Sequence, residues 1–582
     1  MFSTRVWLLS ASFWFLCSRA NGETLADDNA QVVFGTDEPT GESIIMEELS
    51  DLLQSSIWFE ENRTDASEVA RHCVCAKKTA LCPIELTLLS QCNILNSTLP
   101  GQVFFSESAE YQAQQASYYS LEQTDLYPAC RVSPSSAIDV SAIITLATQY
   151  DCAFAVRSGG HILGKGYSNI DATGFTIDLQ KMNEISLLEE GKIVSFGSGC
   201  RWHHVYAALK PHNLTTVGGR VPDVGVAGFL LGGGISALSL AHGFGSSNIV
   251  NYQVVLADGT IRDVNEQTLS DLYWALKLGS TNFAVVTRFD MTTYPLSDVW
   301  GGSLVFEISK GPALLQSHVD FTAKLSSDPM GLNVIGLAWE PVQQNYIVWS
   351  PNLYLLPNPS PPLYADFQEL MPEALLNTMR IADLMSITEE FQAMAPGAGR
   401  VQWFTLTLKA DAAVLWDIHR KGVEIFQPYL NRTGFTWAAL FQPLNHGFAA
   451  ASEKNGGNPS GIKPEDGDSI GACSYICNPG HTMTNVNVTP NVYLVVLGMA
   501  QWSDRVDDEI LKEKVHEHWK WSENTAHERG LLHPFIYMNY ASSLQDVMGS
   551  IGPENLARMR TIKDRYDPAN RFGMNWKGGF KL

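Results

Sequence analysis

The length, composition and charge of the chain describe an acidic globular protein. At 582 residues it is longer than one hydrophobic core usually serves, which predicts at least two domains. Apolar residues make up 45% and charged residues 17%, which excludes a largely disordered chain. A formal net charge of −22, with no offsetting Lys/Arg cluster, excludes the basic face that a nucleic acid needs.

The first twenty residues have the pattern of a signal peptide. Arg5 supplies a positive charge, residues 6–17 form an apolar run, and Ser18 and Ala20 are small residues suited to cleavage. The run is too short to span a bilayer, and no other run is long and apolar enough. We therefore expect a secreted protein with no membrane partner.

Sequons and cysteines also favour an oxidising compartment. Five Asn-x-Thr sequons begin at Asn62, Asn96, Asn213, Asn431 and Asn487. A cysteine cluster follows the leader: Cys73, Cys75, Cys82, Cys92 and Cys130. We interpret residues 21–125 as a disulfide-bearing extension. Zinc binding is the alternative, but the spacing lacks two paired C-x-x-C halves.

The remaining cysteines divide into two pairs. Cys473 and Cys477 share a loop rich in Gly, Asn and Pro, where a local bridge can form. Cys152 and Cys200 have apolar neighbours and are expected to be free and buried. Nine cysteines remain once Cys17 is removed with the leader, so at least one must be unpaired if the rest are bridged.

From Ala129 to about Pro295 the chain alternates between strands and helices. The elements expected here are a helix capped by Ser135-Ser136 and running to Tyr150, strands at 153–156, 176–179 and 192–197, a helix at 201–211, a hairpin around Asp258-Gly259, a helix at 272–277 and a strand at 283–289.

Beyond Pro295 the glycine-rich turns disappear, and strands alternate with helices. Strands are expected at 331–340, 345–356, 400–409, 436–442 and 492–502. Helices are expected at 365–379, 411–427 and 504–529, the last a charged, solvated helix. This pattern predicts an α+β domain with an antiparallel sheet.

Two glycine-rich stretches carry the chemistry. The turn Ser158-Gly159-Gly160-His161 follows a strand, where unhindered backbone N–H groups can approach an anion. Residues 159–166 nearly match a P-loop, but Gly166 replaces the hydroxyl residue that would hold Mg²⁺, which disfavours a nucleotide hydrolase. The stretch 218–236 is dense in glycine, which suits a flat aromatic cofactor or close helix packing.

Several motifs together carry a family resemblance. They are RSGGH at 157–161, VPDVGVAGFLLGGGIS at 221–236, NYQVVLADGT at 251–260, DLYWALKLGSTNFAVVT at 271–287, YMNYASSLQD at 537–546 and RYDPANRF at 565–572. The first four resemble the FAD domain of the vanillyl-alcohol-oxidase/p-cresol-methylhydroxylase superfamily. The last two resemble the C-terminal segment of its berberine-bridge-enzyme-like branch, and the terminal GGFKL is similar to fungal members.

The resemblance implies an α+β fold: a two-part FAD-binding domain of the p-cresol-methylhydroxylase type and an α+β substrate domain with an antiparallel sheet. The domains implied are a signal peptide at 1–20, the extension at 21–125, an FAD-binding domain at 126–297, a substrate domain at 298–530 and a C-terminal segment at 531–582 that returns to the FAD domain. We expect a monomer.

The same resemblance implies the cofactor contacts. Those to the FAD pyrophosphate would come from Arg157, Ser158, Gly159 and Gly160. His161 would bond to the 8α-methyl of the flavin. The flavin and ribityl chain would meet Gly218, Gly219, Val224, Gly225, Gly228 and Ser236. The adenine side would meet Asn282, Val285 and Val286. Asn539 and Tyr540 would close over the flavin.

Four positions bear on the chemistry expected. Val224 matches the position that controls oxygen access in the family, and a small residue there favours an oxidase. Val221 stands where many relatives have a second flavin-linking cysteine, so a single covalent bond through His161 is expected. Tyr537 and Tyr540 are candidate bases, although a buried tyrosine is more often structural.

No metal site is expected. The histidines at 203, 204, 212 and 242 include no i, i+4 pair on a helix, and adjacent histidines point in different directions. On the local pattern alone, His161 is a loop imidazole with local hydrogen bonds; the resemblance changes that interpretation.

The leading hypothesis is a secreted FAD-linked oxidase that oxidises a small secondary metabolite, alcohol or carbohydrate with O2 and releases H2O2. A flavin-fold enzyme that catalyses a cyclisation or another non-oxidative step is the alternative. A non-enzymatic secreted glycoprotein is a third hypothesis.

Overall fold

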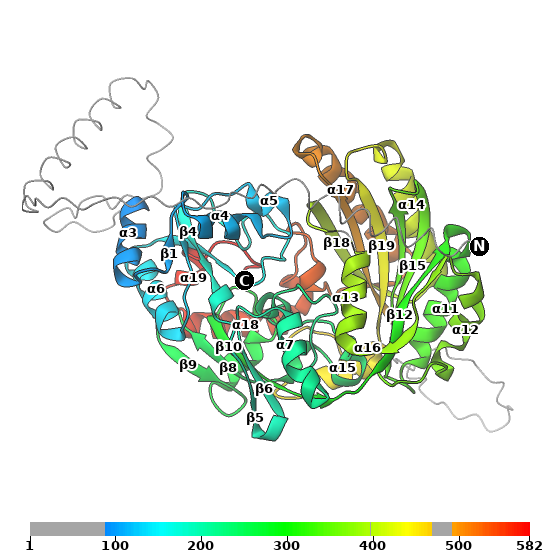
Figure 1. Cartoon of the computed structure of the whole chain (residues 1–582), viewed down its shortest axis with the longest axis horizontal. Coiled ribbons are helices and arrows are strands. Elements are labelled where there is room, and N and C mark those ends of the chain that lie inside the picture. The colour runs from blue at the N-terminus through cyan, green and yellow to red at the C-terminus, as the bar shows by residue number, and fades with distance from the viewer. Residues whose placement is uncertain (1–87, 396, 468–491) are drawn as a thin grey trace, which may run out of the picture. The chain divides into compact units, whose positions relative to one another are not determined.

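The computed structural model describes residues 88–395, 397–467 and 492–582 (Figure 1). The expected signal peptide, the sequons at Asn62 and Asn487 and five of the cysteines after the leader lie outside these ranges. Within them, no helix is long and apolar enough to cross a membrane.

A small mixed sheet forms the first part of the fold. Its order is β1 (Val103–Phe104), β2 (Arg131–Val132), β4 (Gly174–Asp178), β3 (Ala153–Arg157), and β4 runs parallel to both of its neighbours. Helix α6 (Ala137–Gln149) begins at a capping box between Ser136 and Asp139, where the sequence predicted a cap. Its buried face joins the apolar core of this sheet.

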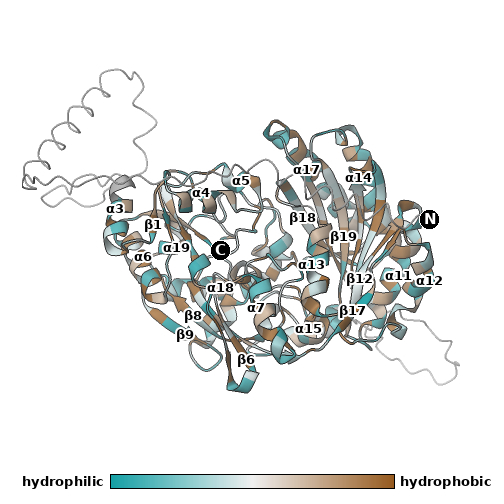
Figure 2. Ribbon diagram, viewed as in Figure 1, coloured by the Kyte–Doolittle hydropathy of each residue, from teal (hydrophilic) through white to brown (hydrophobic). Residues whose placement is uncertain are grey.

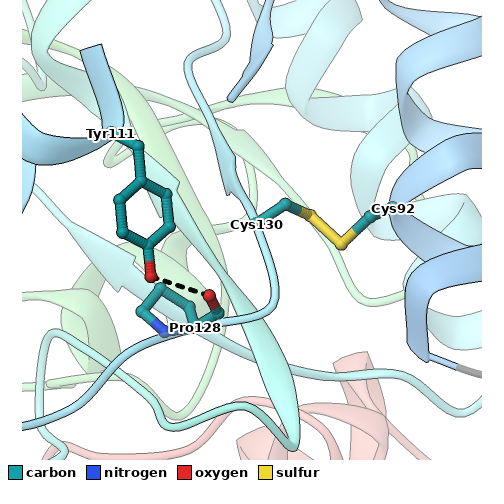
Figure 3. Close-up of a disulfide and its surroundings, with 4 residues drawn as sticks. All are labelled: Cys92, Tyr111, Pro128 and Cys130. Atoms are coloured by element: carbon teal, nitrogen blue, oxygen red, sulfur yellow. Dashed lines mark hydrogen bonds between the residues drawn. A yellow bond between two sulfur atoms is a disulfide. The ribbon is translucent and has the colours of Figure 1, made fainter. Parts of the chain in front are cut away.

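One disulfide ties helix α3 (Leu88–Thr98) to this sheet (Figure 3). Cys92 bonds to Cys130, next to β2, across a sequence separation of 38 residues. This pairing excludes both cysteines from a zinc site. Cys152 and Cys200 are free and buried, as predicted.

An antiparallel sheet forms the second part. Its order is β5 (Ile185–Leu188), β6 (Ile193–Gly197), β10 (Val285–Thr292), β8 (Ile249–Val255), β9 (Ile261–Val264). The predicted hairpin joins β8 to β9, and Gly259 in its turn has φ +82°. The helices of this part are α7 (Trp202–Leu209), α8 (Val226–Leu231), α9 (Ser239–His242) and α10 (Ser270–Leu276).

The third part is a large sheet, ten-stranded over the described residues, with the order β16, β12, β15, β14, β19, β20, β18, β21 along its path. The strands are β12 (Val299–Glu307), β13 (Gly331–Asn333), β14 (Ile335–Glu340), β15 (Asn345–Tyr354), β16 (Leu376–Asn377), β17 (Arg380–Ala382), β18 (Arg400–Lys409), β19 (Thr436–Leu444), β20 (Tyr493–Trp502) and β21 (Leu532–His533). All of its pairings are antiparallel, as predicted.

Helices cover one face of the large sheet (Figure 1). They are α11 (Gly311–Lys324), α12 (Ala365–Leu370), α14 (Ala412–Phe426) and α17 (Asp508–Glu528). Figure 2 shows hydrophobic residues along the strands beneath them, which belong to one buried cluster. The opposite face of β18 and β19 is therefore free to meet the C-terminal segment.

The chain ends beside the first sheet. Helix α18 (Pro553–Tyr566) packs on α10, and α19 (Arg571–Met574) leads to Trp576, which bridges Phe154 of β3. Two backbone hydrogen bonds fix this contact. The Phe154 N–H donates to the Asn575 carbonyl at 2.8 Å, and the Lys577 N–H donates to the Phe154 carbonyl at 2.7 Å.

Two expectations about the elements were wrong. The helix expected at 365–379 ends at Leu370, because Pro372 starts a separate short turn, and β16 and β17 then pair with β12. The strand expected at 331–340 is broken into β13 and β14. The helices that were not predicted include α11, α13 (Leu384–Met394) and α18.

Candidate functional site

Two glycine turns meet backbone to backbone at the end of β3. A Cβ on Gly159 would lie 2.5 Å from Cα of Gly225, and a Cβ on Gly225 would lie 2.3 Å from the nitrogen of Gly159. Gly160 has φ +67°, which favours glycine. Among the described residues, no hydrogen bond uses the backbone N–H of Gly159, Gly160 or His161. The turn can therefore offer these donors to an anion.

The Arg157 side chain packs against Gly160 of the turn. Its guanidinium is fully buried, lies 3.3 Å from the carboxylate of Asp178, and donates to the carbonyls of Gln114 and Ser117 at 2.6 and 2.9 Å. The Arg157 side chain therefore binds protein, and the backbone N–H groups of the turn are the donors that remain for a pyrophosphate. The Ser158 hydroxyl likewise faces protein and donates to the Ser198 carbonyl at 2.6 Å.

Arg201, which the sequence analysis did not single out, joins the two turns. Its guanidinium donates to the carbonyl of Gly159 at 2.9 Å and to that of Asp223. Burial, and next the charge of Arg201, lower the pKa of His161 to about 4. The imidazole of His161 is therefore neutral at pH 7, with a nitrogen lone pair available.

A row of rings connects His161 to the C-terminal segment. The imidazole stacks on Tyr119 with ring centroids 4.1 Å apart and planes 12° apart. Tyr119 meets Trp403 of β18 edge-on at 6.5 Å, and Trp403 meets Tyr540 edge-on at 5.6 Å. Residues 119, 161, 403 and 540 thus form one continuous row of contacts, although they come from four distant segments.

Close packing explains part of the glycine-dense stretch. A Cβ on Gly218 or Gly219 would lie 2.3 or 2.5 Å from the Trp202 ring, and one on Gly232 would overlap the Asn539 amide at 2.0 Å. Gly228 differs, because a Cβ there would meet nothing within 4 Å. Packing therefore explains three of these glycines, and Gly228 leaves open backbone of the kind a cofactor can cover.

Val224 and Ser236 are two further expected contacts in this stretch. Val224 is half-buried and directly precedes Gly225, the glycine that packs on Gly159. Its carbonyl accepts a hydrogen bond from the Trp202 backbone N–H at 3.2 Å. Ser236 is buried, and its backbone N–H donates to the Ser239 hydroxyl at 2.8 Å. The structure thus places Val224, but not Ser236, against the turn that bears His161.

The residues expected on the adenine side are engaged with protein. The Asn282 amide donates to the carbonyls of Gly279 and Phe580 and accepts from the Leu582 backbone, so it holds the C-terminus. Val285 and Val286 pair with β8. The Val286 carbonyl accepts from Ser198, whose own carbonyl accepts from Ser158, so only Val286 is linked to the turn.

The two candidate bases, Tyr537 and Tyr540, differ in burial and in the partners of the phenol oxygen. Tyr537 is buried, and its oxygen accepts from the Ile235 backbone at 2.8 Å and from Asn539 at 3.2 Å. Burial raises the pKa of Tyr537 well above its usual value, so it is a poor base. Asn539 also donates to the Phe229 carbonyl at 3.0 Å, at the C-terminal end of α8.

Tyr540 has polar neighbours on its oxygen. It accepts a 2.7 Å hydrogen bond from the Arg220 guanidinium and lies 3.4 Å from the Gln442 side-chain oxygen. The side chain is half-buried. Tyr540 is therefore the better-placed candidate base.

The expectation about metals concerned the adjacent histidines. The rings of His203 and His204 are 4.0 Å apart, and Nδ1 of His204 accepts from the Arg201 backbone. Within the described ranges, no group of three His, Cys, Asp or Glu side chains is arranged to hold a metal ion.

Comparisons with known proteins name the family. Residues 128–265 match the family described as an FAD binding domain. FAD-dependent monooxygenase drtC of Aspergillus calidoustus is 33% identical over 85% of this chain and 91% of its own length. Bifunctional solanapyrone synthase of Alternaria solani is 28% identical over 84% of this chain and 88% of its own length.

Solved structures share the fold. 6-Hydroxy-D-nicotine oxidase from Arthrobacter nicotinovorans superposes with a TM-score of 0.64 at 20% identity, covering 82% of this chain and 97% of its own. Physcomitrella patens BBE-like 1 superposes with a TM-score of 0.63 at 18% sequence identity, covering 83% of this chain and 97% of its own. The chain belongs to the family of FAD-dependent oxidoreductases that includes drtC, and it has the fold of BBE-like 1. This membership sets aside the hypothesis of a non-enzymatic glycoprotein.

The geometry fits the cofactor of this flavoenzyme family. Unused N–H groups at the 158–161 turn suit the pyrophosphate, and the open backbone at Gly228 suits a flat ring. The neutral His161 adjoins both turns. Of the expected contacts, the structure brings together the 158–161 turn, Val224 and Gly225, while the side chains of Arg157 and Asn282 bind protein.

Proposed function

We propose that this flavoenzyme is a secreted oxidase that removes two electrons and two protons from a small organic substrate and transfers them to O2, giving H2O2. The observation that carries the proposal is the row of rings from His161 through Tyr119 and Trp403 to Tyr540. The row supports the proposal because it connects the candidate flavin-linking residue, through two intervening rings, to the candidate base.

We propose that His161 holds FAD covalently. Its neutral imidazole is a competent nucleophile, and the adjoining glycines fix its position. The net reaction joins an imidazole nitrogen to the 8α-methyl carbon, removes one hydrogen from each, and reduces one O2 to H2O2. A second bond through cysteine is not expected, because residue 221 is valine and burial raises the pKa of Cys200 to about 12.

Tyr540 is the proposed catalytic base. FAD, when bound, supplies the two-electron acceptor. Tyr540 would take the hydroxyl or phenol proton of the substrate, while Arg220 and Gln442 hold its oxygen in place. Tyr537 would hold the backbone of Ile235 under the site. Val224 would leave O2 a path to the flavin, as its small side chain and its place beside Gly159 suggest.

The proposed compartment rests on surface features. The sequon asparagines within the described ranges, Asn96, Asn213 and Asn431, are all exposed, which N-glycosylation requires. The Cys92–Cys130 bond suits an oxidising environment. A mass decrease on glycosidase treatment of the native, extracellular protein would support secretion, whereas an unglycosylated intracellular protein would refute it.

Isotopic oxygen tests the oxidase proposal. Turnover under ¹⁸O2 should give one H2¹⁸O2 per product and no label in the product. One ¹⁸O atom in the product would instead favour the reaction in the name of the relative drtC, a monooxygenase. Product formed without oxygen uptake would favour the non-oxidative alternative, a cyclisation.

A further inference from the structure

Among the described residues, the Arg220 guanidinium has no counter-ion. Its one hydrogen bond among the described residues goes to the Tyr540 oxygen, at 2.7 Å, and no described carboxylate lies within 4.0 Å of it. The side chain is half-buried beside Val221, in the glycine-dense stretch. Since an unpaired cation in such a place is costly, its unused N–H donors suit an anion.

Two further donors lie around Tyr540 without acceptors. The side-chain nitrogens Nε2 of Gln442 and Nε1 of Trp403 are buried and, among the described residues, unpaired. Gln442 is only 3% exposed. Its oxygen lies 3.4 Å from the Tyr540 hydroxyl, and the Trp403 ring lies 5.6 Å from the Tyr540 ring.

The large sheet presents both donors on one face. Through β20, Trp403 is in register with Met499 and then Ala438, and Ala438 and Gln442 point the same way because they are four residues apart on β19. Phe404 and Phe441 point to the opposite face and join the buried cluster under the helices. The donors therefore face the C-terminal segment that carries Tyr540.

We propose that Arg220, Gln442 and Trp403 select a substrate that is a flat aromatic acid: a ring system bearing a carboxylate or a comparably acidic oxygen. This inference rests on the proposed function and names its substrate class. Arginine matches a planar carboxylate with paired N–H donors. The amide and indole N–H groups supply further donors, and the Trp403 ring supplies an apolar surface on which an aromatic ring can pack. A neutral sugar would leave the charge of Arg220 unmatched.

Binding of a matched pair of probes tests this inference. Purified holoenzyme is titrated with 2-naphthoate and with its neutral isostere 2-naphthamide, and Kd is read from the change in flavin absorbance. The wild type should bind the carboxylate at least about tenfold more tightly than the amide. Arg220→Gln should remove this preference, and Arg220→Lys should restore part of it.

The other two donors have their own variants. Trp403→Phe keeps a ring but removes the N–H, and Gln442→Leu removes the amide; each should weaken 2-naphthoate about three- to tenfold. Lys210→Gln, which removes an exposed charge outside the site, is the control and should keep the wild-type ratio. Circular dichroism and flavin content verify that each variant is folded and loaded.

Equal Kd values for the two probes, or no binding of 2-naphthoate up to 10 mM (about the weakest affinity of interest), would overturn the inference. So would an Arg220→Gln protein that loses FAD but keeps the carboxylate preference, since Arg220 would then serve the cofactor. The probes need no turnover, so a preserved preference in a protein without oxidase activity would refute the proposed function and leave this inference standing.

Discussion

Tyr537 and Tyr540 are three residues apart and have different surroundings. The Tyr537 oxygen accepts two hydrogen bonds from protein, whereas the Tyr540 oxygen faces Arg220 and Gln442. Tyr540→Phe should slow anaerobic flavin reduction by about 10²–10⁴-fold, because the proton acceptor is lost. Stopped-flow bleaching with an identified substrate measures this rate.

Tyr537→Phe is the matched control. It leaves the Ile235 N–H unpaired and should lower the free energy of unfolding by about 1–3 kcal/mol, with flavin reduction changed less than in Tyr540→Phe. If Tyr537→Phe were the slower variant, the roles assigned to the two tyrosines would be reversed.

Val224 tests the path of oxygen. Val224→Leu adds one methylene beside the turn that Gly159 and Gly225 form, and should slow reoxidation of the reduced flavin while leaving reduction nearly unchanged. Separate stopped-flow traces measure the two half-reactions, with Val221→Leu as the neighbouring control. Equal effects on both rates, or none on either, would contradict a gating role.

Sequence patterns predicted only the local part of the site. The 158–161 turn, His161 and the 537–540 segment are contiguous motifs, so their residues stand together in the chain. Tyr119, Trp403 and Gln442 belong to unrelated segments and carry no motif, and only the fold brings them to Tyr540. Arg201 and Arg220 flank recognised motifs, but nothing in their spacing indicates which carbonyl or hydroxyl they bind.

At the scale of elements, the disulfide fixes α3 to the first sheet (Figure 3). Closing a loop of 38 residues should stabilise the fold by about 4 kcal/mol, mainly by restricting the unfolded chain. The double variant Cys92→Ala/Cys130→Ala should therefore unfold at lower denaturant concentration. Each single variant should lose as much, and an unchanged midpoint would show that the bond does not constrain the chain.

Helix α13 shows what element prediction missed and why. Its buried residues Leu384, Ile387, Thr388 and Phe391 follow a helical repeat, and Asp383 caps its first turn. The pattern was therefore present, but the segment is short and follows two brief edge strands that local propensity does not reveal. Its Gln392 pairs with Asp223 of the 221–224 loop, a contact that only the tertiary structure shows.

At the scale of the whole molecule, the fold depends on buried neutral histidines. His318, His419 and His518 are at most 2% exposed, and burial lowers the pKa of each to about 4. Between about pH 6.5 and 4 the unfolded chain binds more protons, so stability falls as pH falls. Each histidine should cost on the order of 1–2 kcal/mol between pH 7 and 5.

Denaturant melts at several pH values measure this dependence. His419→Phe keeps a ring between Trp416 and Trp437 but cannot titrate, so it should flatten the slope between pH 7 and 5. His212→Gln, at an exposed position, should not. A slope unaffected by His419→Phe would show that this histidine does not set the acid limit.

The fold class was predictable because strands, glycine turns and family motifs all agree on it. The strands and helices that alternate beyond Pro295 without glycine-rich turns predicted an antiparallel sheet. The pairings in the large sheet are antiparallel, so this prediction is confirmed. The return of the C-terminus to β3 depends instead on the Phe154–Trp576 contact, between residues 422 positions apart, which no local pattern encodes.

The most direct test of the whole account is the mass of one tryptic peptide. Residues 158–165 form a peptide that contains His161 and no cysteine, and residues 193–201 contain Cys200. We predict that the first carries FAD, that the second does not, and that His161→Ala releases all flavin on acid precipitation. Free flavin released from the wild type by acid, with an unmodified 158–165 peptide, would contradict the covalent link through His161.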